Sequence, residues 1–318
     1  MTANDLAVVV NTADPLSNAI GEYYAHRRGV PAANIARVRF GFDRSILPAS
    51  EFNAMKAAVD AQIPAHIQAY ALTWTRPYRV DCMSITSAFA FGFDDRFCAT
   101  GCITTQLSRY FNSTSQRPFD DLQLRPAMSI AAADLPQAKQ LIERGLASDG
   151  TVPNGTAYLV TSGDQARDVR AALYADAQML AGGRLRMEQV RAAALEGRDD
   201  VMFYFIGAVT VPKLLSNRFV PGAVADHLTS YGGMVPDSSQ MSSLRWLEAG
   251  ATGSYGTVVE PCNITAKFPN PALLILHYLS GETLLEAYWK SVAMPGQGLF
   301  IGEPLSAPYR NSAPPSFQ

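Results

Sequence analysis

The chain of 318 residues has no excess of either charge and no long apolar run. Lys and Arg number 26 against 28 Asp and Glu, which gives a net charge of −2 and a pI near 6.1. This balance creates no positive field that would attract nucleic acid or an anionic membrane non-specifically. No apolar run approaches the ~20 residues that a membrane-spanning helix needs. We therefore expect neither a nucleic-acid partner nor an integral membrane segment.

Cysteine and histidine are also scarce. Four cysteines are too few for a fold built on disulfides. Cys98 and Cys102 can close a small loop in an oxidising compartment, and two free thiols fit the sequence equally well. The four histidines are scattered, without a CxxC or HxxxH pair, so we predict no metal site. The first ten residues show no signal peptide, which leaves the compartment open.

The common nucleotide and nucleophile motifs are missing as well. The sequence has no GxxxxGK[ST] and no GxGxxG after its first apolar run, so we predict no cofactor. It also lacks the GxSxG turn that presents a nucleophilic serine in many hydrolases.

Apolar residues make up 48% of the chain, and they alternate between two patterns. Continuous apolar runs such as 201–206 are typical of strands buried on both faces, and segments such as 135–147 are amphipathic helices. Strands separated by helices predict a parallel sheet with right-handed crossovers. We expect strands at 6–11, 34–40, 69–74, 126–131, 155–161, 201–206, 223–229, 252–259 and 299–301. We expect helices at 15–28, 50–62, 135–147, 165–180, 241–249, 271–279 and 283–292.

This rhythm repeats, which predicts two related α/β halves, 1–125 and 126–318. Residues 82–125 have weak periodicity and many small polar residues. A stretch of this length without regular structure is either a surface loop or a lid that faces a ligand.

Candidate site residues were sought where strands end, because ligands of parallel sheets bind there. The first candidates are Asp226, His227 and Ser230, at the end of the 223–229 strand. Ser230 can act as a nucleophile with His227 as its base only if the strand bends, since this offset places the two side chains on opposite faces. The alternative is a buried His227 that is hydrogen-bonded to Asp226 or to the backbone.

The next strand ends in Glu260, Pro261 and Cys262. Cys262 can act as a nucleophile if a base such as His227 lowers the pKa of its thiol. The alternative is that Cys262 is a small buried apolar residue without a catalytic role. Glu260 precedes a proline, which restricts its backbone to an extended conformation. Its carboxylate can act as an acid or base, or it can pair with Lys267 or Arg76.

Further residues are candidates for ligand contact. They are Thr229, Gly232, Gly233, Arg76 and Lys267. The two glycines allow backbone amides to approach a ligand or form an oxyanion hole.

Several longer motifs carry a resemblance. The segments VVVNTADPLSNAIGEYYAHRRGVPAANI, VADHLTSYGG, GATGSYGTVVEPC, GETLLEAYWKSV and QGLFIGEPL occur in order along nearly the whole chain. Together they resemble an uncharacterised bacterial family whose genes accompany exosortase-type protein-sorting systems. That resemblance implies an exported or periplasmic protein.

Two other segments are similar to a second family, more distantly. RPAMSIAAADLPQAKQLIERGLASDG and WLEAGATGSYGTV resemble elements of gingipain-type cysteine peptidases. This resemblance implies a caspase-like fold, a three-layer sandwich around a parallel sheet. In that fold the catalytic His follows a Gly at one strand end, and the Cys ends the next strand.

The matching positions lack both catalytic residues. Gly207 and Ala208 stand at the His position, and Thr229 and Ser230 stand at the Cys position. We therefore favour a pseudo-peptidase that binds a peptide or a glycan in cell-envelope or export processes. The alternative is a hydrolase or transferase with a remodelled site, with Ser230 or Cys262 as nucleophile. A weaker third hypothesis is an enzyme that binds a small carboxylate ligand through Arg76, Lys267 and Glu260.

Overall fold

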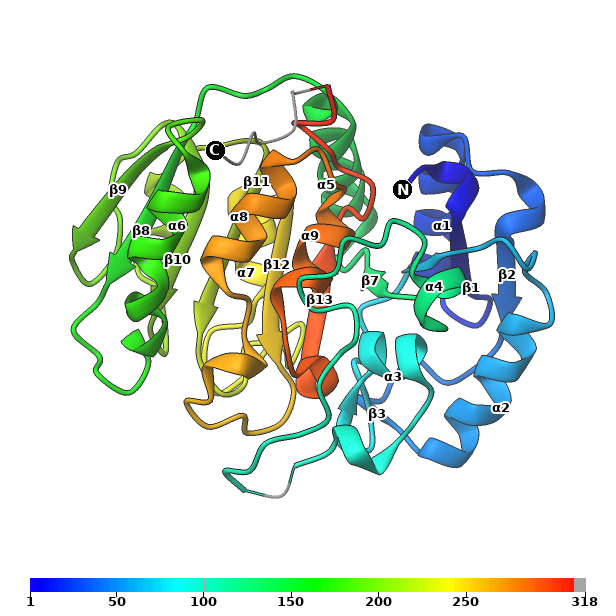
Figure 1. The fold of residues 1–318 in the computed structure, drawn as a ribbon. Coiled ribbons are helices and arrows are strands. Elements are labelled where there is room, and N and C mark those ends of the chain that lie inside the picture. Colours follow the sequence, from blue (N-terminus) through cyan, green and yellow to red (C-terminus); the bar gives the residue numbers. More distant parts are fainter. Residues whose placement is uncertain (100, 312–318) are drawn as a thin grey trace.

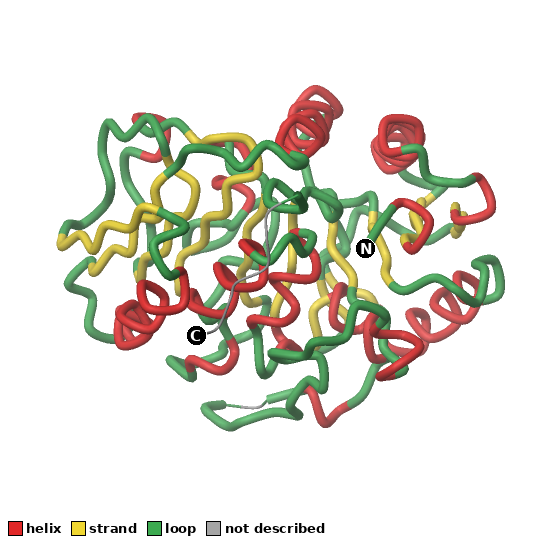
Figure 2. Tube along the Cα trace, turned by 45° about the horizontal axis from the view of Figure 1, so that its top comes forward, coloured by secondary structure: helices red, strands yellow, loops and turns green. Residues whose placement is uncertain are grey.

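The computed structural model describes residues 1–99 and 101–311. Thr100 and the last seven residues of the predicted second half lie outside this range. Ten strands form one sheet in the order β2-β1-β4-β7-β13-β12-β11-β10-β8-β9 (Figure 1). Helices cover both faces of this sheet (Figure 2), which gives an α/β sandwich. Within the described residues, no helix is both long enough and apolar enough to cross a membrane.

The strands of the large sheet have the following bounds: β1 Leu6–Asn11, β2 Ile35–Val38, β4 Ala69–Leu72, β7 Ala127–Ser129, β8 Thr156–Thr161, β9 Arg186–Arg191, β10 Val201–Gly207, β11 Phe219–Leu228, β12 Gly253–Thr257 and β13 Gly298–Gly302. A small second sheet contains β3 Ile46–Leu47, β5 Arg79–Val80 and β6 Met83–Ser84. The helices are α1 Pro15–Arg28, α2 Ala49–Asp60, α3 Ile85–Phe91, α4 Pro118–Leu122, α5 Leu135–Ser148, α6 Tyr174–Ala181, α7 Leu244–Ala249, α8 Pro271–Leu279 and α9 Leu284–Ser291.

Most neighbouring strands of the large sheet are parallel, as predicted. Every residue of β1 and β10 is buried, which explains their continuous apolar sequences. The exception is β13, which runs antiparallel to β12 from Gly298 opposite Thr257 to Gly302 opposite Gly253. The expectation of a purely parallel sheet was therefore wrong at this pair. On its other side β13 meets β7 through one bridge, between Ile301 and Ser129.

The segment 82–125 is less irregular than predicted. It contains α3, which starts at the N-cap Ser84 and is buried along nearly its whole length. The Phe89 ring lies edge-on to Phe52 and Tyr70, so this helix belongs to the core. The prediction of an irregular excursion is therefore wrong for α3, whereas the later part of the segment is largely exposed loop.

Two further differences affect the region of the predicted site. The helix expected at 165–180 begins later, since a 3-10 helix at Asp168–Leu173 precedes α6 and leaves 162–167 as a loop. Strand β9 was not predicted, because it is a mostly exposed edge strand with charged and polar residues. Strand β7, which follows the predicted boundary at 125/126, pairs with β4, so one sheet continues across that boundary. The division into two halves stays a prediction.

Candidate functional site

The ends of β11 and β12 open into one pocket. The two strands are parallel neighbours, so the residues that follow them emerge at the same edge of the sheet. The pocket has a volume of about 300 Å³. It is lined by Cys102, Ala166, Arg167, Leu228, Thr229, Ser230, Glu260, Cys262 and Asn263. The structure therefore brings together four of the predicted site residues: Thr229, Ser230, Glu260 and Cys262.

Thr229 is held in place by a side chain that the sequence did not suggest. Its hydroxyl donates a hydrogen bond of 2.6 Å to Oε1 of Gln240. The same oxygen accepts from the Tyr231 amide at 3.0 Å. The amide group of Gln240 thereby fixes the turn that follows β11, and Thr229 is oriented within the protein.

Ser230 has a freer side chain. Its carbonyl accepts a hydrogen bond of 2.9 Å from the hydroxyl of Thr257, which ties the two strand ends together. Its own hydroxyl has no hydrogen-bond partner among the described residues, and the residue is half-buried in the pocket wall. The Ser230 hydroxyl is thus available to a ligand.

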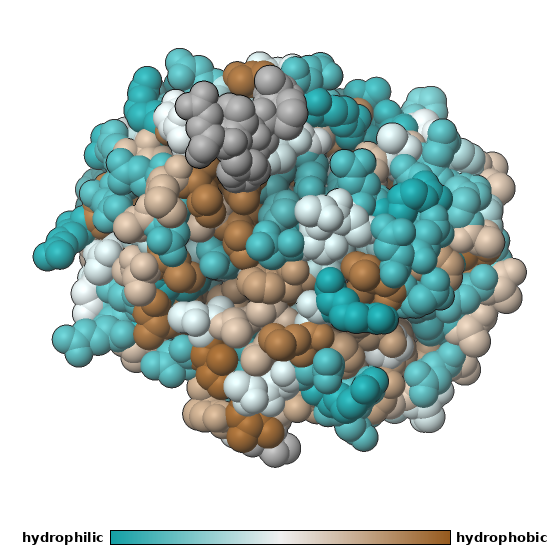
Figure 3. Space-filling model, in the orientation of Figure 1, coloured by the Kyte–Doolittle hydropathy of each residue, from teal (hydrophilic) through white to brown (hydrophobic). Residues whose placement is uncertain are grey.

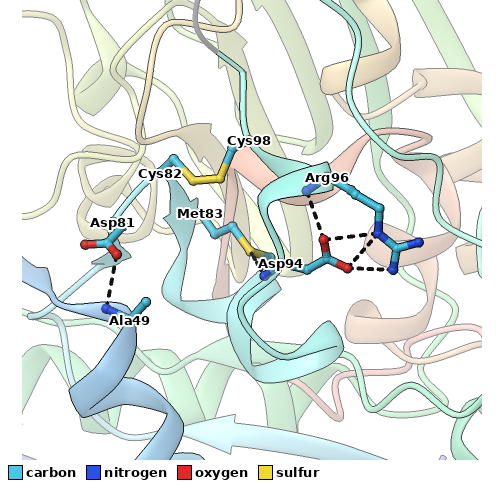
Figure 4. The surroundings of a disulfide bond; sticks show 7 residues. All are labelled: Ala49, Asp81, Cys82, Met83, Asp94, Arg96 and Cys98. Carbon is cyan, nitrogen blue, oxygen red and sulfur yellow. Dashed lines mark hydrogen bonds and ion pairs between the residues drawn. A yellow bond between two sulfur atoms is a disulfide. The ribbon is translucent and has the colours of Figure 1, made fainter.

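Glu260 and Cys262 form the opposite wall. Oε1 of Glu260 accepts from the Cys262 amide at 2.7 Å, and Cys262 has a φ of 55°. Cys262 forms a disulfide with Cys102. Cys262 therefore has no free thiol in the oxidised protein. The prediction that Cys262 acts as a nucleophile does not hold for this form. Neither of the two alternatives for Cys98 and Cys102, a shared loop or two free thiols, is observed, because Cys98 pairs with Cys82 (Figure 4).

His227 is not a base for Ser230. The imidazole is 1% exposed and lies outside the pocket wall. Its Nδ1 accepts a hydrogen bond of 2.9 Å from the Trp246 indole, and its Nε2 donates to the Met241 carbonyl at 2.9 Å. Burial lowers the pKa of His227 to about 4, against the smaller raising effect of the Met241 carbonyl. The alternative of a buried histidine with satisfied hydrogen bonds is the one observed.

Asp226 also points away from the pocket, into a buried ion pair. Its Oδ1 lies 2.6 Å from Nη1 of Arg170, and both side chains are nearly inaccessible. Arg170 also donates to the Ile206 carbonyl at 3.2 Å. Burial raises the pKa of Asp226, and the charge of Arg170 opposes this shift. This pair links the 3-10 helix Asp168–Leu173 to the centre of the sheet, and the predicted catalytic role of Asp226 is not supported by its position.

Gly232 and Gly233 allow the loop after β11 to lie close to the backbone of β12, and they do not form an oxyanion hole. The Gly233 amide donates to the Thr257 carbonyl at 2.9 Å. A Cβ on Gly233 would come within 2.4 Å of the Gly256 carbonyl oxygen. The absence of side chains thus lets the loop after β11 pass over β12, and the Gly233 amide is not free for a ligand.

Lys267 and Arg76 do not join the pocket. Lys267 is fully buried, and its amine has no hydrogen-bond partner among the described residues. Burial lowers the pKa of Lys267, and the charge of Glu260 acts in the opposite direction. Arg76 is exposed and lines a separate hollow with Asp14 and Pro236. Glu260 lines the strand-end pocket, Arg76 lines the separate hollow and Lys267 lines neither, so the hypothesis that the three bind one carboxylate ligand fails on geometry.

The loop after β8 closes the side of the pocket next to β10. Asp168 accepts from the amides of Ser162 at 3.1 Å and Gly163 at 2.7 Å, which folds this loop back onto the sheet. A Cβ on Gly207 would come within 2.1 Å of the carbonyl oxygen of Arg167. Backbone therefore fills the space beside the end of β10, where the resemblance places a catalytic histidine.

Sequence reasoning missed two residues that line the pocket, Arg167 and Cys102, and it missed Gln240, which holds Thr229 in place. Arg167 follows β8, so applying the strand-end argument to that strand would have found it. It was overlooked because the helix was expected to start at 165. Cys102 lies in a loop that lines the pocket, Gln240 lies in a loop that contacts Thr229, and no sequence pattern predicts either contact.

Comparison with known proteins gives a fold and no family. No family model matches the chain, and no curated protein matches it significantly. A solved structure described as "Structure of Protease" is similar, with a TM-score of 0.50 and 9% sequence identity. The match covers 98% of this chain and 79% of that chain. The chain therefore has an α/β fold that a protease also has.

The arrangement is better suited to holding a ligand than to activating a nucleophile. Arg167, Ser230 and Glu260 offer a cation, a hydroxyl and a carboxylate in one small hollow. The histidine that could activate Ser230 is buried outside the pocket, and the two cysteines that line the pocket are joined in a disulfide.

Proposed function

We propose that this protein is a pseudo-peptidase of the caspase-like fold that binds a peptide in its strand-end pocket. The observation that carries the proposal is the pocket's combination of a free Ser230 hydroxyl with a His227 that is buried and fully hydrogen-bonded. A serine without a base is a weak nucleophile, whereas its hydroxyl is a good donor and acceptor for a ligand.

Two features support the caspase-like, gingipain-type part of the proposal. Strands β10 and β11 are adjacent and parallel, as the resemblance requires of the strands that end in the catalytic His and Cys. A protease structure has a similar overall fold. The catalytic positions hold Ala208 and Ser230 instead, which favours a binding role over peptide cleavage.

The chemistry of the pocket favours a short polar segment as ligand. Arg167 is one-quarter exposed and pairs with Asp164 through Nη1 at 2.8 Å, so its remaining N–H groups can donate to a carboxylate or carbonyl of a ligand. Glu260, whose Oε1 already accepts from the Cys262 amide, can accept from an amide or an amine of a ligand. A volume of about 300 Å³ admits one or two side chains rather than a folded domain. Two disulfides fit an oxidising compartment, in agreement with a role in the cell envelope or in export.

The test is a binding screen with the oxidised protein. A fluorescent library of short peptides should show saturable binding, and Ser230→Trp should remove it by filling the pocket. Arg167→Ala gives a milder variant that weakens binding without adding bulk. Ser50→Trp, at an exposed serine on α2, is the matched control and should bind like the wild type. Circular dichroism of each variant checks the fold.

Other outcomes contradict the proposal in distinct ways. Binding of oligosaccharides but no peptide would make the ligand a glycan. Covalent labelling of Ser230 by a fluorophosphonate, or turnover of ester substrates that Ser230→Ala abolishes, would favour the hydrolase alternative. Absence of both binding and labelling would refute a ligand site at this edge of the sheet.

A further inference from the structure

The Cys102–Cys262 disulfide forms part of the pocket wall. It joins residues 160 positions apart, and both cysteines line the hollow beside Ser230 and Glu260. Cys102 is exposed, whereas Cys262 is half-buried. Cys102 is therefore the more solvent-accessible residue of the pair, and both residues border the ligand site.

The segment around Cys102 has few other attachments. Residues 101–104 and 106–107 are exposed, and Ile103 and Leu107 leave about half of their side-chain surface in solvent. The backbone of the described residues 101–105 makes one hydrogen bond, from the Ile103 amide to the Gly101 carbonyl. In Figure 1 this segment runs along the lower edge of the molecule, and Figure 3 shows hydrophobic side chains at that edge. The disulfide is thus its main connection to the end of β12.

The second disulfide has different surroundings. Cys82 and Cys98 are both half-buried, next to the turn in which Arg96 pairs with Asp94 (Figure 4). Met83, the neighbour of Cys82, is fully buried in the core. The two disulfides of one chain therefore differ in access, which allows an internal comparison.

We propose that Cys102–Cys262 is a thiol-exchange site. A thiolate from a small thiol or a cysteine-containing peptide attacks Sγ of Cys102, the more exposed residue of the pair. A mixed disulfide forms between the incoming sulfur and Cys102, the Cys102–Cys262 bond breaks, and Cys262 leaves with the electron pair as a thiolate. The step needs no oxidant or reductant other than the incoming thiol. Exposed disulfides are the ones that usually take part in such exchange.

The exchange changes the chemistry of the pocket. It places a free Cys262 thiol beside Ser230 and Glu260, and it releases residues 101–105 from the end of β12. The same hollow then has a nucleophile that the oxidised state lacks. This inference goes beyond peptide binding, because it concerns a covalent reaction at the pocket wall and holds whether or not the oxidised pocket binds a peptide.

The experiment uses the native, fully oxidised chain. The protein is incubated with reduced glutathione, quenched with iodoacetamide at intervals, and mapped by mass spectrometry. We expect glutathione on Cys102 and carbamidomethyl on Cys262, at a rate at least ten times that of any modification of Cys82 or Cys98. A second arm replaces glutathione with a short peptide that contains one cysteine, and its serine analogue serves as the blank. The two arms distinguish a small thiol from a peptide thiol.

Two variants and one spectrum complete the test. Cys82→Ser/Cys98→Ser should keep the exchange, and Cys102→Ser/Cys262→Ser should abolish it. The aromatic fine structure of the near-ultraviolet circular dichroism spectrum should persist while the adduct forms. The proposal is overturned if Cys82 and Cys98 react as fast, if glutathione is found on Cys262 instead, or if the adduct appears only as the spectrum is lost. Peptide binding measured on the oxidised protein is a separate result, so either proposal can fail alone.

Discussion

Acid should destabilise this fold through a single buried imidazole. His227 is neutral in the folded protein, with Nδ1 accepting from the Trp246 indole and Nε2 donating to the Met241 carbonyl. Protonation would place a hydrogen on Nδ1 that faces the Trp246 indole N–H, and it would leave a positive charge on the imidazole that water does not reach. Burial, which disfavours the charged form, is the largest cause of a folded-state pKa of about 4, compared with about 6.5 in an unfolded chain; the Met241 carbonyl opposes this shift and the charge of Arg170 adds to it.

The sign and size of the effect follow from this difference. The folded pKa lies below the unfolded one, so the unfolded chain takes up the proton first as the pH falls. The stabilisation from a neutral His227 is complete above pH ~6.5 and is lost between pH ~6.5 and ~4. The total loss is about 3 kcal/mol, of which about 2 kcal/mol falls between pH 7 and pH 5.

Urea unfolding at pH 7 and pH 5 measures this loss. Carboxylates contribute to the same pH range, so the wild type is compared with His227→Gln, which cannot titrate. The wild type should lose about 2 kcal/mol more than the variant between the two pH values. His66→Gln, at an exposed histidine, is the matched control. An excess loss below about 0.5 kcal/mol would show that the folded protein accepts the proton, and the argument from burial would be wrong.

Three further changes test the packing around the pocket. Arg170→Met should lower the free energy of unfolding by about 3–5 kcal/mol in a urea titration, because it leaves the buried Asp226 carboxylate unpaired. Adding Asp226→Leu should restore most of this loss. Gly256→Ala should lower the free energy of unfolding by about 3 kcal/mol or more, since its Cβ would lie 2.3 Å from the Gly232 backbone. An unchanged melting temperature would contradict the close approach of the two backbones. Cys102→Ser/Cys262→Ser should lower the free energy of unfolding by up to about 5 kcal/mol, because the bond closes a loop of 160 residues, and a loss under about 1 kcal/mol would mean that the unfolded chain is hardly restricted by it.

The strand-rich core could be predicted because its signal is local. The apolar runs that became β1 and β10 are buried throughout, and burial on both faces of a sheet requires such runs. Helix α1 begins after Asp14, whose side chain caps the Leu16 amide, and ends at Gly29 in a left-handed conformation. Both signals are visible in the sequence. Strand β9 carried no such signal, because an exposed edge strand need not be apolar.

The pocket could be predicted only in part. The rule that parallel strands end at one edge of a sheet placed Ser230 and Glu260 together. The rule does not decide which way a side chain turns, and His227 and Asp226 turned to opposite faces of the sheet to meet Trp246 and Arg170. Those partners come from distant segments, so no local sequence pattern predicts them.

The sequence by itself determined the α/β alternation, the buried strands and the positions of the helix caps, because these depend on residues within one or two turns of each other. Only the tertiary structure decided the direction of β13, the pairing of the four cysteines and the residues that face the pocket. These features depend on contacts between segments far apart in the chain, such as the covalent bond between Cys102 and Cys262 or the antiparallel pairing of β12 with β13, and no single segment contains both partners.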